Sequence, residues 1–188
     1  SGKTPLVIRL CRVLQDAGLK VGVASRGYGR SSRGLQWVEA TSDPAVTGDE
    51  PLLIAQRAAV PVIVANDRCA AVKALFDECV DVVIADDGLQ HHRLPRSMEI
   101  CVVDGSREFG NGLQLPAGPL REPIQRLRQV DHVVVNGEME QTLSVPHAVT
   151  MHLVPRMLHS LDQNLSWRLS QFSGCRASAV AGIANPDR

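Results

Sequence analysis

Residues 80–93 read VDVVIADDGLQHHR, an apolar run that ends in two adjacent carboxylates, Asp86 and Asp87. The run is rich in Val and Ile and does not alternate with polar residues, which is typical of a strand covered on both faces in a parallel sheet. Two carboxylates beside a buried strand are costly unless a cation or a hydrogen-bond donor compensates them. The stretch therefore predicts a core strand followed either by an ordinary polar loop or by a divalent-metal site.

Similar apolar runs recur along the chain, and in its first half they alternate with helical patterns. Further strands are predicted over residues 19–25, 60–66, 98–104, 130–137 and 178–185. Helices are predicted at about 5–17, 49–59, 67–77 and 120–128. This alternation predicts an α/β fold with a doubly wound, mostly parallel sheet. Such sheets bind ligands at the carboxyl ends of their strands, where Asp86, Asp87, Asp104 and Asn185 are expected.

The last part of the chain gives weaker signals. Residues 147–155 are compatible with one more strand, antiparallel at an edge of the sheet, and residues 156–175 are predicted to be irregular.

Composition excludes some classes of function. The 188 residues include 20 basic and 20 acidic side chains, so bulk charge does not predict binding to nucleic acid. Aromatic residues make up only 3%, which argues against a stacking surface for single strands. The five cysteines form no CxxC pair, and their odd number favours free thiols in a reducing compartment. No apolar stretch is long enough to span a bilayer, and no signal peptide is present.

The first residues, SGKTP, have the pattern of the second half of a phosphate-binding loop, G-x-x-x-x-G-K-[ST]. In such a loop the start of the following helix attracts phosphate oxygens. Lys3 is then expected to reach the β- and γ-phosphates of a nucleotide, and the Thr4 hydroxyl to bind Mg²⁺. A carboxylate at the end of a later strand completes a metal site of this type, which favours the metal-site interpretation of Asp86 and Asp87.

Two other motifs are ambiguous when each is taken by itself. Residues 24–34 interleave Arg26, Arg30 and Arg33 with glycines, which suits either a phosphate-binding loop or a solvated turn. Asp49 begins a predicted helix, where a favourable interaction with the helix dipole is the ordinary explanation. A carboxylate in this position is also suited to act as a general base.

Considered together and in order, the motifs resemble the tetraacyldisaccharide 4′-kinase family of lipid A biosynthesis over nearly the whole chain. They are SGKTP (1–5), SRGYGR (25–30), GDEP (48–51), DDGLQHHRL (86–94), VDG…FGNG…LPAGPLREP (103–123) and GIANP (182–186). The resemblance implies an ATP- and Mg²⁺-dependent kinase with a P-loop NTPase fold. Its implied reaction transfers the γ-phosphate to the 4′-hydroxyl of a tetraacyldisaccharide 1-phosphate, forming lipid IVA. The implied location is the cytoplasmic face of the bacterial inner membrane, peripheral or anchored by an N-terminal segment.

The resemblance also implies a role for each matching residue. The implied ATP-binding residues are Ser1, Gly2, Lys3 and Thr4, and the implied catalytic residues are Asp49, as the base, and Lys3. The implied metal site comprises Thr4, Asp86, Asp87 and Gln90. The implied acceptor-binding residues are Arg26, Tyr28, Arg30, His92 and Arg121. Contact with a membrane surface is implied for segments of the family outside these residues, and no nucleic-acid partner is implied.

Residues 1–145 are expected to form the kinase core without its first strand, and residues 146–188 to form connecting or edge strands and the start of a C-terminal lobe. The family pattern has a hydrophobic segment before SGKTP and a histidine-containing stretch after GIANP, so the chain is expected to be truncated at both ends. Two other interpretations stay open, which are a P-loop switch protein that binds regulatory partners and an inactive nucleotide-binding fragment. The Asn-Lys-x-Asp motif of a guanine-specific switch is missing from 64–69 and 133–138, which disfavours the first.

Overall fold

The computed structural model of the chain describes residues 2–139, 147–161, 165–176 and 178. Its contacts divide the chain into two compact units, residues 1–152 and 153–188. Ser1 and the GIANP motif, and all of the predicted strand at 178–185 except its first residue, lie outside the described residues.

A four-stranded sheet in the first unit has the order β2-β3-β1-β4. Its strands are β1 (Val21–Ser25), β2 (Gln36–Trp37), β3 (Val62–Val64) and β4 (Val82–Ala85). β1 lies at the centre and pairs in parallel with β3 and β4, while β2 is an antiparallel edge strand that the sequence did not predict. Asp86 therefore follows the carboxyl end of β4, as predicted, and the carboxyl end of β1 lies beside it.

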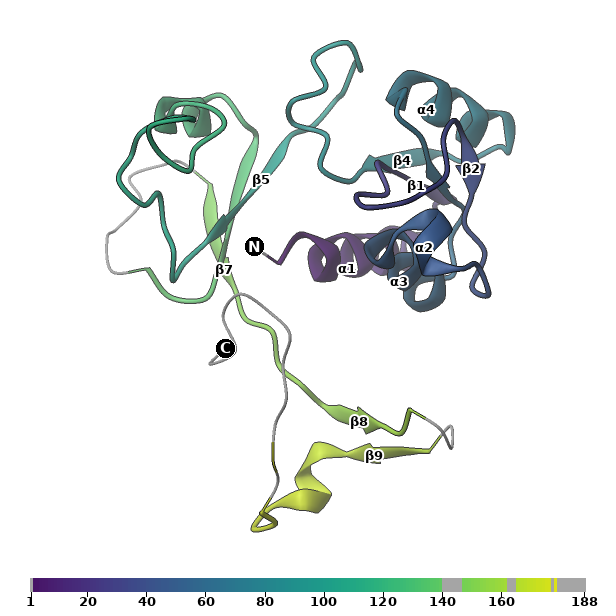
Figure 1. Ribbon diagram of the computed structural model, residues 1–188, viewed down its shortest axis with the longest axis vertical. Helices are drawn as coiled ribbons and strands as arrows, with labels where there is room; N and C mark the ends of the chain where they lie inside the picture. Colours follow the sequence, from purple (N-terminus) through teal and green to yellow (C-terminus); the bar gives the residue numbers. More distant parts are fainter. Residues whose placement is uncertain (1, 140–146, 162–164, 177, 179–188) are drawn as a thin grey trace. The chain divides into compact units, whose positions relative to one another are not determined.

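Helices cover both faces of this sheet (Figure 1). They are α1 (Lys3–Asp16), α3 (Asp49–Ala58) and α4 (Arg68–Asp77), together with the short α2 (Pro44–Thr47), which the sequence did not predict. α1 and α3 pack against each other on one face, and α4 lies on the other. Val62 and Val64 share a buried cluster with α1 and α3, whereas Ile63 faces α4. The apolar runs are continuous because successive side chains enter different cores, and the predicted doubly wound α/β fold is confirmed.

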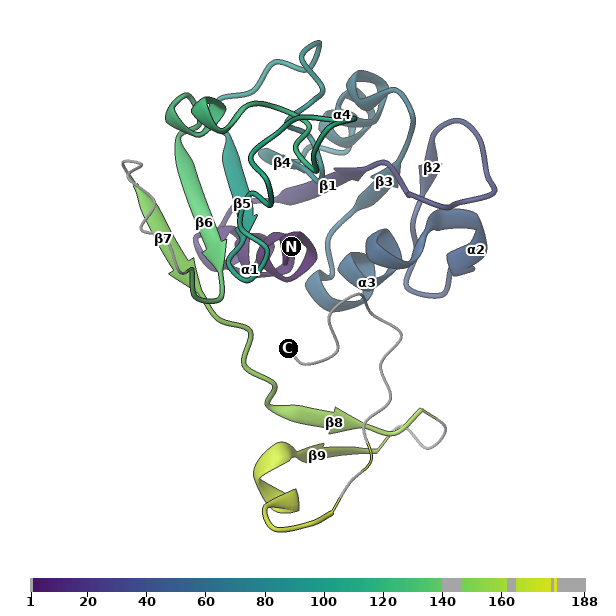
Figure 2. The same cartoon turned by 60° about the vertical axis from the view of Figure 1, so that its left-hand side comes forward.

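The remaining strands of the first unit form a second ladder, β5-β6-β7, in which every pair is parallel (Figure 2). The strands are β5 (Ile100–Asp104), β6 (His132–Asn136) and β7 (Ala148–Met151). The prediction of an antiparallel strand within 147–155 is therefore wrong in direction, because residue composition indicates a strand without indicating its polarity. The helix predicted at 120–128 is only a 3₁₀ turn, η1 (Ile124–Arg128), which begins directly after Pro123.

The second unit contains a two-stranded antiparallel hairpin of β8 (Met157–His159) and β9 (Ser166–Arg168), followed by the 3₁₀ turn η2 (Leu169–Phe172). The prediction of irregular structure over 156–175 is therefore wrong for these elements. Both strands are exposed and only three residues long, which is too short for a periodic pattern to predict a strand. Trp167 packs edge-to-face on Phe172, with ring centroids 6.2 Å apart. Among the described helices, none has both the length and the apolar composition needed to cross a bilayer.

Candidate active site

The start of α1 is suited to bind an anion. Gly2 caps the helix with φ of 86° and makes no side-chain capping bond, and the first turn contains no acidic residue. The amides of this turn are therefore not claimed by a capping side chain, and the helix dipole adds positive potential there. A Cβ atom at Gly2 would lie 2.5 Å from Nδ2 of Asn136, at the end of β6. Only glycine fits here, since both its positive φ and this close approach exclude a side chain.

Lys3 and Asp87, 84 positions apart, are joined directly at this point. Lys3 Nζ lies 2.6 Å from Asp87 Oδ1, and Arg121 Nη1 lies 3.3 Å from Asp87 Oδ2. Partial burial opposes ionisation of Asp87, but the hydrogen bond and charge of Lys3, aided by Arg121, hold its pKa below the usual value. The lysine of the SGKTP motif and the second strand-end carboxylate thus lie in direct contact, and both side chains are more than one-third exposed.

Asp86 lies deeper than its neighbour. It is 3% exposed, and Ser25 Oγ at the end of β1 donates to its Oδ2 at 3.0 Å. The guanidinium of Arg68, itself 2% exposed, donates from Nη1 to the carbonyl oxygens of Ser25 (2.8 Å) and Ala65. Burial lowers the pKa of Arg68, and the negative charge of Asp86 partly offsets this effect. Asp86 and Arg68 are therefore two buried groups of opposite charge, and Asp87 is close enough to interact electrostatically with Arg68.

The carboxylate oxygens of Asp86 suit a hard divalent cation. Asp86 Oδ1 is buried and has no hydrogen-bond partner among the described residues, so one carboxylate oxygen is available for a ligand. The Thr4 side chain is also buried at the start of α1. The described part of the chain contains no group of three or more His, Cys, Asp or Glu residues that could hold a metal ion by themselves. Because Mg²⁺ usually binds through one or two protein oxygens together with substrate phosphates, the available donors are compatible with it.

The loop after β1 holds the arginine-rich motif beside the start of α3. Arg26 and Tyr28 are exposed, with Tyr28 at 91%, whereas Arg30 is held by Ser32, Gly34 and Asn66. A Cβ atom at Gly27 would lie 2.6 Å from the carbonyl oxygen of Thr47, and one at Gly48 would lie 3.1 Å from the Gly27 Cα. These two glycines let the loops touch, which brings the exposed Asp49, at the first turn of α3, next to the arginine loop.

Gln90 and Arg121 are joined to the same site by side-chain hydrogen bonds, whereas no such bond links His92 to it in the described part of the chain. Arg121 Nη1 lies 3.4 Å from Gln90 Oε1, and Gln90 Nε2 donates to Glu122 Oε1 at 2.8 Å. His92 is exposed. Its neighbour His91 instead lines a cavity of about 270 Å³ together with Arg68 and Asn66. Burial and the nearby charges of Arg68 and Arg26 lower the pKa of His91.

The sequence interpretation did not single out Ser25, Arg68 or Glu122 as members of this site. Ser25 ends a buried strand, so its position alone could have drawn attention to it. Arg68 begins a helix, where a positive charge opposes the dipole, and this mismatch is a usable signal. Glu122 carries no such signal, since an arginine–glutamate pair at a helix start has an ordinary explanation.

This chain resembles known proteins in both sequence and fold. The family model described as tetraacyldisaccharide-1-P 4′-kinase matches residues 1–188. The chain is 49% identical over 197 residues to a tetraacyldisaccharide 4′-kinase of Xanthomonas oryzae pv. oryzae, and 50% identical over 191 residues to one of Hahella chejuensis. All of the chain is covered in both cases, against 57% and 55% of the relatives. The chain thus spans little more than half the length of these curated relatives.

A solved structure is similar to this chain as well. The crystal structure of LpxK from Aquifex aeolicus in complex with ATP superposes with a TM-score of 0.68 at 32% identity. The match covers 85% of this chain and 51% of the Aquifex chain.

Proposed function

The chain belongs to the tetraacyldisaccharide-1-P 4′-kinase family, and we propose that the protein transfers the γ-phosphate of ATP to the 4′-hydroxyl of a tetraacyldisaccharide 1-phosphate, forming lipid IVA. The observation that carries this proposal is the contact of Lys3 Nζ with Asp87 Oδ1 at 2.6 Å, at the start of α1. A lysine, a strand-end carboxylate pair and a helix start without a capping side chain in one place are the parts that a P-loop kinase needs. The ATP complex of the Aquifex relative supports ATP as the donor.

Phosphoryl transfer depends mainly on positioning and on neutralising charge. The amides of the first turn of α1 bind phosphate oxygens, and Lys3 leaves Asp87 to reach the β- and γ-phosphates. Thr4 and Asp86, whose Oδ1 has no partner among the described residues, would hold Mg²⁺. In that position the ion would neutralise charge on the phosphates. Asp87 and Gln90 complete this side of the site by orienting Arg121.

Asp49 acts as the general base that accepts the proton of the attacking sugar hydroxyl. Its place at the start of α3, beside the arginine loop, keeps its carboxylate exposed to an acceptor. Arg26, Arg30 and Tyr28 of that loop, with Arg121 and His92, bind the acceptor sugar and its phosphate. Guanidinium groups suit this task because they bind phosphate bidentately.

Replacing the base tests the proposal. In the full-length protein, Asp49→Ala is expected to lower kcat by about 10²–10⁴-fold, the usual contribution of general-base catalysis. The Kd for Mg·ATP, measured by calorimetry, is expected to stay unchanged. The neighbouring Glu50→Ala serves as the matched control, since it removes an exposed carboxylate from the same helical turn. An Asp49 variant that loses nucleotide affinity but keeps its rate at saturation contradicts this role.

A nucleotide-competition assay separates this function from that of a P-loop switch protein. Displacement of labelled Mg·ATP by ATP but not by GTP supports the kinase, whereas preference for GTP supports the switch.

The acceptor is a lipid, so we propose that the protein works at a membrane surface, on the cytoplasmic side where ATP is available. Fractionation of cells that produce the full-length protein tests this location. Recovery in the membrane fraction supports it, and recovery only in the soluble fraction contradicts it.

A further inference from the structure

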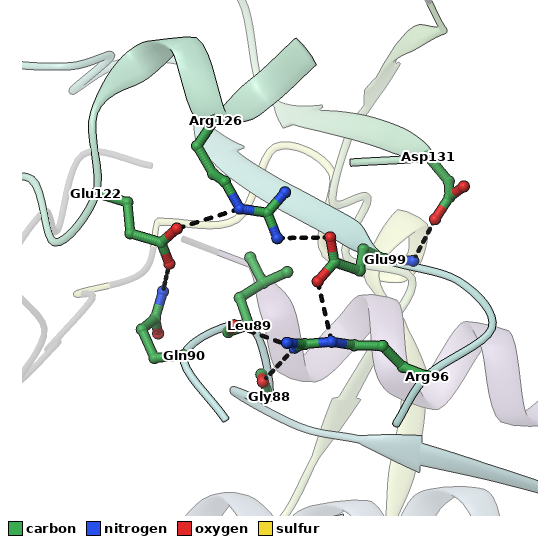
Figure 3. Close-up of polar contacts among 8 residues, drawn as sticks. All are labelled: Gly88, Leu89, Gln90, Arg96, Glu99, Glu122, Arg126 and Asp131. Carbon is green, nitrogen blue, oxygen red and sulfur yellow. Dashed lines mark hydrogen bonds and ion pairs between the residues drawn. The ribbon is translucent and has the colours of Figure 1, made fainter. Parts of the chain in front are cut away.

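A ring of polar contacts starts and ends in the loop that follows β4 (Figure 3). Arg96 Nη1 donates to the main-chain oxygens of Gly88 (2.9 Å) and Leu89 (3.1 Å). Arg96 Nε then pairs with Glu99 Oε1 at 3.0 Å, and Arg126 Nη2 pairs with Glu99 Oε2 at 2.6 Å. A single carboxylate thus bridges two guanidinium groups, one of which holds the main chain of the loop.

The ring closes through the turn at the start of η1. Arg126 Nε lies 3.2 Å from Glu122 Oε2, and the other oxygen of Glu122 accepts from Gln90 Nε2 at 2.8 Å. Gln90 in turn contacts Arg121, which contacts Asp87. The loop of residues 87–90 is therefore held at its main chain by one arm of the ring and at its Gln90 side chain by the other.

Glu99 is the least exposed charged member of this ring. Its side chain is 14% exposed, against 23% for Arg96 and 21% for Arg126, while exposure rises to 60% at Arg121. The main chain of Glu99 is fixed at the start of β5, because its N–H donates to Asp131 Oδ2 at 2.7 Å. The hydrogen bond that Arg126 donates to Glu99 raises the pKa of Arg126, and burial opposes this effect. The ring is thus anchored on the second ladder and is most exposed at the ligand side.

The loop needs such support because its backbone is unusual. Asp87 has φ of 54°, in the left-handed region that costs a non-glycine residue energy unless its surroundings hold it. Gly88 is packed so tightly that a Cβ atom would lie 2.9 Å from the Ala85 Cβ. The direction of the Asp87 side chain therefore depends on the contacts that hold residues 88–90.

We propose that Glu99 is a positioning residue of the nucleotide site, acting through Arg96 on the main chain of residues 88–89 and through Arg126 and Glu122 on the side chain of Gln90. It touches neither the phosphates nor the acceptor. Its part in the reaction rests on the proposed function, since Asp87 and Gln90 matter for catalysis only if they serve the nucleotide. Its structural part, the fixing of the loop, does not depend on that function.

Hydrogen exchange of the full-length protein without nucleotide tests the structural part. The amides of His91 and Leu94 donate to oxygens within the loop, so their protection reports its order. Glu99→Gln removes the charge that pairs both arginines, and exchange of these amides is expected to quicken by about tenfold, as for the loss of one charge-assisted hydrogen bond. Arg96→Lys keeps the positive charge, but a lysine lacks the planar guanidinium group that contacts a carboxylate and two carbonyl oxygens at once. Exchange of the same amides is therefore expected to quicken in this variant too. Glu78→Gln, on an exposed glutamate that ends α4, is the control and leaves exchange unchanged.

Calorimetric titration with Mg·ATP tests the catalytic part. Glu99→Gln is expected to weaken binding by about tenfold, the lower end of the effect of removing a group that orients ligating residues. Combining it with Gln90→Ala gives a double-mutant cycle. Because one arm of the ring ends on the Gln90 side chain, the double variant is expected to lose less affinity than the product of the two single effects, whereas independent effects multiply.

The two measurements separate the possible failures. Unchanged exchange at His91 and Leu94 in both Glu99→Gln and Arg96→Lys overturns the proposal, as do effects on binding that multiply in the cycle. If the unaltered protein binds no Mg·ATP, the proposed function fails, while the exchange measurement still decides whether Glu99 orders the loop. If Glu99→Gln does not fold, Arg96→Lys carries the exchange test, since it keeps the net charge.

Discussion

At the scale of single residues, Asp87 is central to the site, because its carboxylate pairs with both Lys3 and Arg121. Its pKa is lowered below the ordinary value of 3.8 in the folded protein. Such a group stabilises the fold fully above its unfolded pKa, and the contribution is lost as the pH falls through the lower folded pKa. The pairs are more than one-third exposed, so solvent screening keeps their contribution small.

Asp87→Asn is therefore expected to lower the free energy of unfolding by about 0.5–1 kcal/mol near neutral pH, the range of exposed ion pairs. The difference from the unaltered protein is expected to shrink once the pH falls below 3.8 and to disappear in stronger acid. Urea unfolding at neutral and acidic pH measures both values. Asp16→Asn, which replaces an exposed aspartate at the opposite end of α1, is the control. A loss of stability that persists unchanged in acid contradicts the ion-pair explanation.

The residues that the sequence identified in this site are those with local signals. Lys3 follows a glycine before an amphipathic helix, and Asp86 and Asp87 end an apolar run. Arg68 escaped attention because its role depends on residues distant in sequence, which are Ser25 at the end of β1 and Asp86 after β4. His92 and His91 are adjacent in sequence, and only the turn after Gly88 decides that His91 lines the cavity.

At the scale of elements, two loops meet through glycines, which sets the distance between the arginine motif and Asp49. Gly27 and Gly29 both have positive φ, at 64° and 78°. A Cβ atom at Gly27 would lie 2.6 Å from the Thr47 oxygen, while one at Gly29 would meet nothing within 4 Å. The two positions therefore have the same backbone cost and differ only in the loop contact.

Gly29→Ala is expected to destabilise the protein by about 1–2 kcal/mol through its left-handed backbone. Gly27→Ala is expected to cost about 1–3 kcal/mol more, since the Thr47 carbonyl must move. It is also expected to lower kcat more than Gly29→Ala does, because the shift moves Asp49. Urea unfolding and steady-state kinetics of the full-length variants give both comparisons. Equal effects of the two substitutions on stability and rate would show that the loop contact is unimportant.

Most elements of the first unit were predictable because each combines a strong pattern with a clear end. β1, β3, β4, β5 and β6 lie within the predicted ranges, and α1, α3 and α4 match to within two residues. β2, β8 and β9 are two or three residues long, which is too short for periodicity to register. The direction of β7 and the division of the strands into separate ladders depend on pairing between distant segments. A local pattern does not contain that information.

At the scale of the whole molecule, ligand binding is coupled to folding of the first unit. The proposed nucleotide site draws its parts from α1, the ends of β1 and β4 and the turn before η1, so it exists only when these segments have folded together. A ligand that binds the folded state alone stabilises it in proportion to the logarithm of its concentration above Kd. The site therefore offers a measure of function that does not need the lipid acceptor.

Mg·ATP at a hundredfold excess over its Kd is expected to raise the free energy of unfolding of the full-length protein by about 2.7 kcal/mol. Chelation of the metal is expected to remove most of this gain, because the phosphates and Asp86, whose Oδ1 has no partner in the described part of the chain, would then lack a cation to neutralise their charge. Lys3→Ala is expected to abolish the gain, whereas Glu78→Gln keeps it. Thermal unfolding with and without nucleotide, magnesium and chelator measures these differences. Stabilisation that survives both Lys3→Ala and chelation would place the nucleotide somewhere other than the start of α1.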